Sequence, residues 1–232
     1  MTQTTPILST SDSQKIAAAV SAAEAHANAE IVTVVTRQSD SYADVALVWS
    51  ALIAALALVA LALWTGFALA FVDSLLGLWA HHWNPHEILK LALLAATIKF
   101  AVTWLILHWR PLRLLLTPGR IKSARTRARA NIAFRLAAQN RTAGATGVVI
   151  YLSLAERRAE IVADAAIAAK VAPEVWGDAM HTMLAHFRET RVADGMVAGV
   201  AQVGAILAEH FPRDMRNAKE LGNELPDGPI EL

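Results

Sequence analysis

An uncharged apolar stretch from Val45 to Val72 constrains this chain more than any other feature. Its 28 residues include no Asp, Glu, Lys, Arg or His, whereas about 20 apolar residues suffice to cross the ~30 Å hydrocarbon core of a bilayer. A helix of this length and composition inside a soluble domain would be unusual. The stretch therefore predicts a transmembrane helix over residues 45–72, with length to spare for tilting.

A second apolar stretch returns the chain across the membrane. We expect the second transmembrane helix at residues 89–109, because the first needs a return partner and we find no third apolar stretch. Lys99 lies near its middle, where a lysine costs about 2.5–3.5 kcal/mol on insertion. We expect Lys99 either to snorkel towards the headgroups or to face a polar group of a neighbouring chain. Six of the seven tryptophans lie in the region of the two spans and their connection: Trp49, Trp64, Trp79, Trp83, Trp104 and Trp109.

The loops differ in charge, and this difference predicts the orientation. Residues 110–141 hold nine Lys or Arg and no acid, whereas the connection at residues 73–88 holds no Lys or Arg. The positive-inside rule then places both termini and the soluble domain in the cytoplasm and the 73–88 loop outside. Met1 to Asp12 has neither the basic nor the apolar region of a signal peptide. We therefore expect a two-span protein of the cell inner membrane.

The soluble part is divided by this hairpin. A helix at Ser11–Ala27 and a strand at Glu30–Thr36 come before it, and together they are too small to form a stable core. The expected elements after it are a basic helix at Arg120–Gln139, strands at Val148–Ser153 and Arg158–Ala163, and helices at Pro173–Thr190 and Asp194–His210. We therefore expect one α/β domain split between residues 1–44 and 110–228, a three-layer α/β/α sandwich with a small mixed sheet. Residues 213–232 read as a polar, extended tail.

Several segments of the soluble part resemble the TPM domain. They are Ala29–Val32, Gly147–Ile150, Arg157–Asp164, Trp176 with Asp194–Gly195, His210–Pro212 and Asn223–Asp227. The set is similar to a bacterial membrane-anchored subgroup, with the domain here interrupted by the hairpin, and it covers roughly residues 12–44 and 120–228. The resemblance implies an α/β/α sandwich. Some members of the family are described as acid phosphatases, some bind calcium, and some assist the repair of membrane photosynthetic complexes.

Three carboxylates are candidates for a metal site. Glu30 starts a predicted strand, Asp164 ends one and Asp194 starts a predicted helix. Ligands of α/β folds gather at strand ends and helix N-termini, and calcium takes six or more oxygen ligands. Both aspartates could instead act as helix N-caps, which satisfy backbone amides without any metal.

No catalytic residues can be assigned from the sequence. The chain contains no cysteine, which excludes disulfides, thiol nucleophiles and cysteine-ligated metals. It also lacks an Asp-x-Asp pair, a Gly-x-Ser-x-Gly motif, a Walker A loop and a His-Glu-x-x-His motif. A divalent-metal-dependent phosphatase at the membrane surface is therefore an alternative that rests on the resemblance alone.

The basic helix suggests contact with the bilayer. It carries Arg120, Lys122, Arg125, Arg127 and Arg129, with Ala124, Ala128, Ile132 and Leu136 at steps of four residues. Each Lys or Arg near anionic lipid contributes about 1 kcal/mol, whereas a formal net charge of +1 does not favour nucleic acid. We expect a membrane-anchored module that binds a membrane-protein partner or a lipid surface, in assembly or quality control. The sequence leaves open whether the chain also forms a homo-oligomer.

Overall fold

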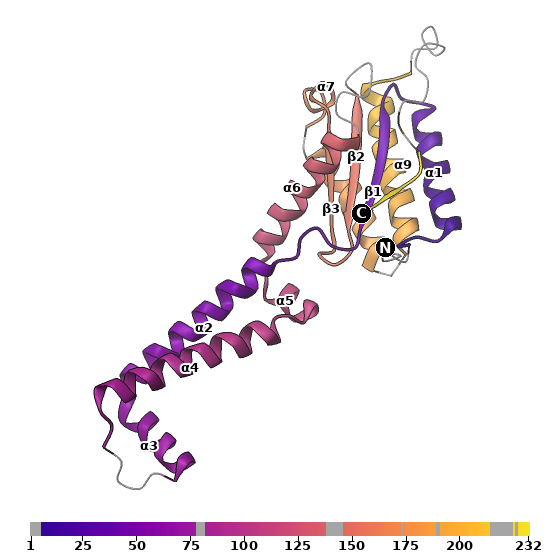
Figure 1. The fold of residues 1–232 in the computed structure, drawn as a ribbon. Helices are drawn as coiled ribbons and strands as arrows, with labels where there is room; N and C mark the ends of the chain where they lie inside the picture. The colour runs from indigo at the N-terminus through magenta and orange to yellow at the C-terminus, as the bar shows by residue number, and fades with distance from the viewer. Residues whose placement is uncertain are drawn as a thin grey trace. The chain divides into compact units, whose positions relative to one another are not determined.

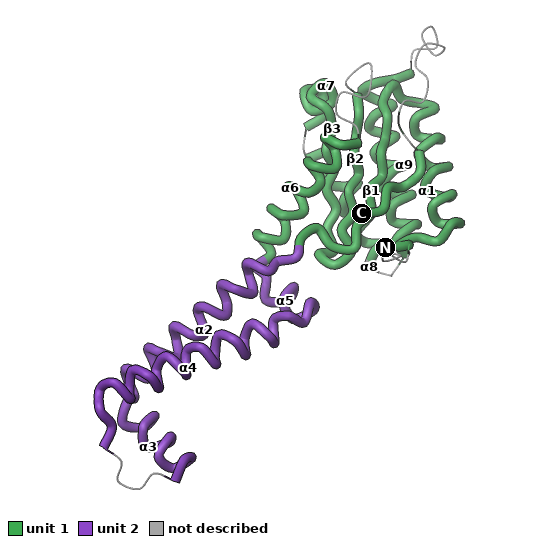
Figure 2. Tube along the Cα trace, viewed as in Figure 1, with its two compact units in different colours: residues 1–40, 119–232 green, residues 41–118 purple. Residues whose placement is uncertain are grey.

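The computed structural model describes residues 6–77, 82–137, 146–172, 174–188, 191–213, 225 and 227–232. The chain divides into two compact units (Figure 2). Met1–Asp40 and Gly119–Leu232 form one, called here the α/β unit, and Ser41–Pro118 form the other, the apolar unit. These limits differ from the expected 1–44 and 110–228, since residues 41–44 and 110–118 fall in the apolar unit and the last four residues in the α/β unit.

A four-stranded mixed sheet of order β3-β2-β1-β4 lies at the centre of the α/β unit (Figure 1). The strands are β1 (Glu30–Thr36), β2 (Gly147–Ser153), β3 (Arg158–Ala163) and β4 (Ile230–Glu231). β1 pairs in parallel with β2, Glu30 opposite Gly147, and with β4, whereas β3 is antiparallel to β2. The mixed sheet is confirmed, and its two central strands come from either side of the apolar unit in sequence.

Helices cover both faces of this sheet. The elements on one face are α1 (Thr10–Glu24), α8 (Val175–Arg188) and α9 (Val192–His210), which share a core with Ile31 and Val35 of β1. On the other face α6 (Gly119–Ala137) packs with Val32 and Val34. Neighbouring β1 residues point to opposite faces, as the pleat requires. A short helix, α7 (Ala165–Ala168), follows β3.

The C-terminal segment departs from the extended tail expected at residues 213–232. Ile230–Glu231 form β4, and the carboxylate of Glu231 accepts hydrogen bonds from the amides of Ile7 (2.7 Å) and Leu8 (3.0 Å). Leu225 is buried in the cluster beneath α6. A strand of two residues has no periodicity, so the sequence pattern did not reveal it. Residues 214–224 and 226 lie outside the described residues.

The apolar unit contains α2 (Ala43–Leu63), α3 (Thr65–Leu76), α4 (Pro85–Ile106) and α5 (Arg110–Leu116). The single helix expected over residues 45–72 is divided at Trp64, whose φ of −122° and ψ of 42° are not helical. The hydroxyl of Thr65 donates to the carbonyl of Leu61 at 2.7 Å and supplies a partner at this break. α4 starts earlier than expected because Asn84 and Glu87 form a capping box.

Among the residues that the structure describes, three helices are long and apolar enough to cross a membrane: α2, α4 and α9. The expectation that only two stretches have this length and composition was therefore wrong. The helices differ in packing, since 44% of the apolar stretch of α9 is buried within the protein, against 17% for α2 and none for α4. The buried apolar residues of α9 belong to the core beneath the sheet. The apolar composition of this helix therefore contributes to packing inside the α/β unit.

Candidate functional site

Two of the three carboxylates predicted as metal ligands flank the start of β2. Glu30 lies on β1, and its amide donates to the carbonyl of Thr146 at 3.2 Å. Asp164 follows β3; its amide donates to the carbonyl of Gly147 (2.9 Å), and its Oδ2 accepts from the amide of Gly147 (3.1 Å). Two strand spacings separate the backbones of Glu30 and Asp164, about 10 Å. Asp164 occupies the N-cap position of α7, but its side chain makes no capping bond there.

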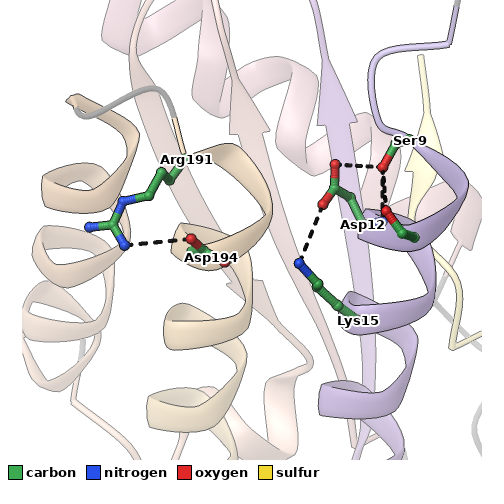
Figure 3. A network of polar contacts seen from close by, with 6 residues as sticks. Ser9, Asp12, Lys15, Arg191 and Asp194 are labelled. Atoms are coloured by element: carbon green, nitrogen blue, oxygen red, sulfur yellow. Dashed lines mark hydrogen bonds and ion pairs between the residues drawn. The ribbon is translucent and has the colours of Figure 1, made fainter.

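Asp194 lies at the opposite edge of the unit. The C-terminal end of α9 is held near the start of β1, where the amide of Asn28 donates to the carbonyl of Phe211 at 2.8 Å. Asp194 lies 16 residues before His210 on this helix, about 24 Å away at 1.5 Å per residue. Its Oδ2 lies 3.5 Å from Nη1 of Arg191, the N-cap residue of α9. Figure 3 shows this pair together with a separate network of Ser9, Asp12 and Lys15 at the start of α1.

The predicted calcium ligands therefore do not converge. Within the described ranges, no group of three or more His, Asp or Glu side chains could hold a metal ion. Calcium needs six or more oxygen ligands, and Oδ2 of Asp164 already accepts a hydrogen bond from the amide of Gly147. The residues do not fit calcium, and no phosphoryl-transfer step through a metal follows from them.

A different set of carboxylates meets at this edge, and two of its members were missed from the sequence. We call Glu24, Glu30 and Asp227 the acidic corner. Glu24 ends α1, and its Oε1 accepts a 2.7 Å hydrogen bond from the amide of Ile31. Burial raises the pKa of Glu24 to about 7; the Ile31 hydrogen bond opposes the rise, and the charges of Glu30 and Asp227 add to it.

The C-terminal segment completes the acidic corner. The hydroxyl of Ser21 on α1 donates to the carboxylate of Asp227, while Arg213 donates to the carbonyl of Glu24 at 3.2 Å and its charge slightly lowers the pKa of that carboxyl. One sequence signal could have drawn attention to Glu24. An acid in the last turn of a helix is disfavoured by the helix dipole, so its presence there needs a reason.

The outer face of α6, defined by Ala124, Ala128, Ile132 and Leu136, is exposed. Ile132 is 45% exposed and Leu136 is 68% exposed. The residues that α6 buries against the sheet are instead Thr126, Ala130, Ala133, Phe134 and Ala137. Their mostly small side chains let the helix approach the sheet closely. The apolar stripe read from the sequence therefore faces away from the core.

Arginines border this outer face along both sides. Arg127 and Arg135 lie in the i+4 row on one side, Arg125 and Arg129 lie in the row on the other side, and Arg120 comes one turn before Ala124. Apolar side chains flanked by cations are typical of a helix that lies in a membrane interface.

The five predicted basic residues have different surroundings. Arg125 is paired with Asp40, and Lys122 is half-buried, whereas Arg120, Arg127 and Arg129 are exposed. Burial raises the pKa of Glu160 on β3, and the charge of Arg127 opposes this rise. Burial likewise raises the pKa of the Tyr151 phenol, and the hydrogen bond between Tyr151 and Ser39 and the charge of Arg129 oppose this rise. The positive charge of these five residues is therefore partly neutralised by groups within the α/β unit.

A buried polar cluster fixes the segment that leaves β1 towards the apolar unit. Glu156, only 7% exposed, lies in the turn between β2 and β3. Its carboxylate accepts from the amide of Ser39 (3.0 Å) and from the hydroxyl of Ser153. The hydroxyl of Ser39 also lies 3.2 Å from that of Tyr151. These hydrogen bonds, called here the Glu156 clamp, hold the chain at Ser39, two residues before the apolar unit begins at Ser41.

Comparison with known proteins agrees with this fold. Residues 120–206 match the model of the TPM domain. The whole chain also resembles the NMR structure of the BA42 protein from the psychrophilic bacterium Bizionia argentinensis, with a TM-score of 0.55, 15% sequence identity and 100% of each chain covered. At that identity the likeness concerns the fold alone. No curated protein matches the chain. Residues 120–206, which include nearly all of α6 together with β2, β3 and α8, are therefore similar to the TPM domain.

Proposed function

We propose that this protein is a membrane-anchored TPM module that rests on the anionic surface of the bilayer in which it is inserted. In this proposal α2 and α4 cross a bacterial inner membrane as a hairpin interrupting a three-layer sandwich, and α6 lies in the lipid interface. The observation that carries the proposal is the outer face of α6, where Ile132 and Leu136 are exposed between rows of arginines.

Both components of this face favour an anionic membrane. Fully burying a Leu or Ile side chain contributes about 1.5–3 kcal/mol, so partial insertion of Ile132 and Leu136 contributes a fraction of that each. Arg127 and Arg135 each add about 1 kcal/mol next to anionic lipid. The connection supports the arrangement, since only two residues separate Leu116 of α5 from Gly119 of α6.

The distribution of charge supports a cytoplasmic position for the module. Residues 110–141 hold nine Lys or Arg without an acid, and the 73–88 connection holds none. Short cytoplasmic loops carry such an excess of positive charge. The inner leaflet also carries the anionic lipids that α6 would contact. Orientation and lipid docking are thus consistent with one another.

The absence of cysteine from the sequence allows a clean test with single labels. The full chain, with Leu136→Cys carrying an environment-sensitive fluorophore, is placed in nanodiscs of phosphatidylcholine with or without phosphatidylglycerol. We expect a blue shift and quenching by spin-labelled lipid that increase with phosphatidylglycerol. Ser11→Cys, exposed on α1, is the matched control. A Leu136 label that responds no more than the Ser11 label would refute docking.

Charge variants and sidedness complete the test. Arg127→Ala with Arg135→Ala should weaken the phosphatidylglycerol effect at Leu136, whereas Lys15→Ala on α1 should leave it unchanged. In intact cells, the Ser11→Cys variant should react with an impermeant maleimide only after the membrane is opened. Labelling from outside would reverse the proposed orientation.

A further inference from the structure

The apolar unit contains a groove of about 720 Å³ between α2, α3 and α4. The break at Trp64 ends α2 and starts α3, and both helices and α4 contribute side chains to the walls. Aromatic rings line one part, among them Phe67 and Phe71, and alanines such as Ala60 and Ala95 line another. Among the described residues that line the groove, Lys99 is the one that carries a charge.

Lys99 has no counter-charge at its level of the apolar unit. The acids of residues 41–118 are Asp44, Asp73 and Glu87, and none of them lines the groove. Asp44 lies in the first turn of α2. Asp73 accepts a 3.0 Å hydrogen bond from the indole of Trp83, and Glu87 belongs to the capping box of α4. Glu87 lies 12 residues before Lys99, about 18 Å along the helix.

We propose that this groove receives a transmembrane helix of a different membrane protein, with an Asp or Glu that pairs with Lys99. The inference rests on the proposed membrane insertion of α2 and α4. An intramembrane cation is costly without a partner, and the charge of Lys99 calls for an anion. The alanines suit a helix as occupant, because small side chains let helix backbones approach closely in a membrane.

The depth of Lys99 favours an acidic side chain over a lipid headgroup. Lys99 is seven residues from Ile106 at the nearer end of α4, about 10 Å inside. From Lys99 the groove continues along Ala95 and Leu91, towards the farther end of the helix. A phosphate at the nearer interface would lie outside the groove. A carboxylate in the middle of a helix would lie beside Lys99 while the rest of that helix fills the apolar part.

A second copy of this chain does not fit the same position. Its own spans offer no acid between Val45 and Val72 or between Leu91 and Trp109. Bringing two copies together at this groove would add a second Lys99 to the first and leave both without a counter-charge. Charge complementarity therefore selects a heterologous partner.

The test uses the full chain in phosphatidylcholine nanodiscs and a synthetic Leu/Ala helix of about 21 residues, long enough to span the bilayer. The peptide carries a dansyl group and either one central Asp or Leu at that place. Association is measured by energy transfer from the tryptophans of the chain. We expect the Asp peptide to bind roughly 3- to 20-fold more tightly than the Leu peptide, the range of intramembrane polar contacts.

Variants locate the effect at Lys99. Lys99→Leu should abolish the preference for the Asp peptide, and Lys99→Arg should preserve it. Lys90→Leu, a charge change near the start of the same helix, should leave it intact. Equal binding of the two peptides by the unmodified chain would overturn the inference. So would a preference that disappears once phosphatidylglycerol is added, because a lipid would then occupy the groove.

Failure of the inference can be told apart from failure of the proposed function. Insertion is established before any peptide is added: the full chain should float with liposomes, and this association should resist alkaline extraction. A chain that does not float refutes the membrane anchor itself. A chain that floats but does not distinguish the two peptides refutes only the pairing at Lys99, and the response of the Leu136 label remains an independent measure of docking by α6.

Discussion

The carboxyl group of Glu24 offers a direct measurement of what the acidic corner does to the stability of the α/β unit. The proposed change is Glu24→Gln. Gln keeps an Oε1 that can accept the hydrogen bond from the amide of Ile31, and it has nearly the same volume. The variant removes only the ionisation, so its effect reports the free energy of holding a charge among Glu30, Asp227 and buried apolar groups.

The sign and size follow from linkage between protonation and folding. The pKa of Glu24 is raised from 4.5 to about 7 in the folded protein, with burial as the largest cause. The folded chain therefore binds a proton that the unfolded chain releases between pH 4.5 and 7, and stability falls as pH rises through this window. The full shift corresponds to about 3 kcal/mol. Because Glu24 is half-exposed, screening by solvent reduces this to about 1–2 kcal/mol.

Thermal unfolding of the full chain in detergent micelles, followed by calorimetry at pH 4.5 and pH 8, provides the measurement. At pH 8, Glu24→Gln should raise Tm by roughly 2–8 °C, at 2–4 °C per kcal/mol for a unit of about 150 residues. At pH 4.5 the two proteins should unfold at nearly the same temperature, because Glu24 is then protonated when folded. Glu209→Gln, an exposed carboxylate on α9, is the control without a pH-dependent difference.

Two results would refute the reasoning. An equal effect of Glu24→Gln at both pH values would mean that the amide changes packing and not charge. A variant less stable than the unmodified protein at pH 8 would mean that ionised Glu24 stabilises the corner, through its hydrogen bond or a bound cation, and that the pKa is not raised.

Two further substitutions test the packing of the α/β unit by the same unfolding measurement. Glu156→Ala should cost about 2–4 kcal/mol, because the buried amide of Ser39 loses its acceptor; a loss under 0.5 kcal/mol, roughly the effect of a surface change, would show that the clamp is not stabilising. Gly204→Ala should cost about 1–3 kcal/mol, since the new Cβ would lie 2.6 Å from Cβ of Ala23. The matched change Gly177→Ala on α8 places a Cβ that meets nothing within 4 Å, and it should stabilise the fold by about 0.5–1 kcal/mol. Equal effects of the two glycine changes would contradict close packing of α1 on α9.

Local patterns were enough to predict most of the elements. The β-branched run of β1 and the apolar run of β2 produced strands where they were expected, within one residue at each end. The uncharged stretch after Val45 produced an apolar helix for the same reason, because hydropathy and propensity act over a few neighbouring residues. The break at Trp64 was not predicted, because a single glycine such as Gly66, two residues later, is tolerated inside a helical pattern.

The arrangement of the candidate site was decided by the tertiary structure. α6 offers two faces on which small or apolar side chains recur, and the sheet buries the one with Ala130 and Phe134 while Leu136 stays exposed. Burial is the main cause of the raised pKa of Glu24, and the charge of Asp227, which is about 200 residues away in sequence, adds to it. The sequence by itself thus determined most of the helices, the strands β1, β2 and β3, and the apolar hairpin, because these depend on local spacing. Which faces meet, and which charges become neighbours, depended on long-range packing that leaves no periodic trace in the sequence.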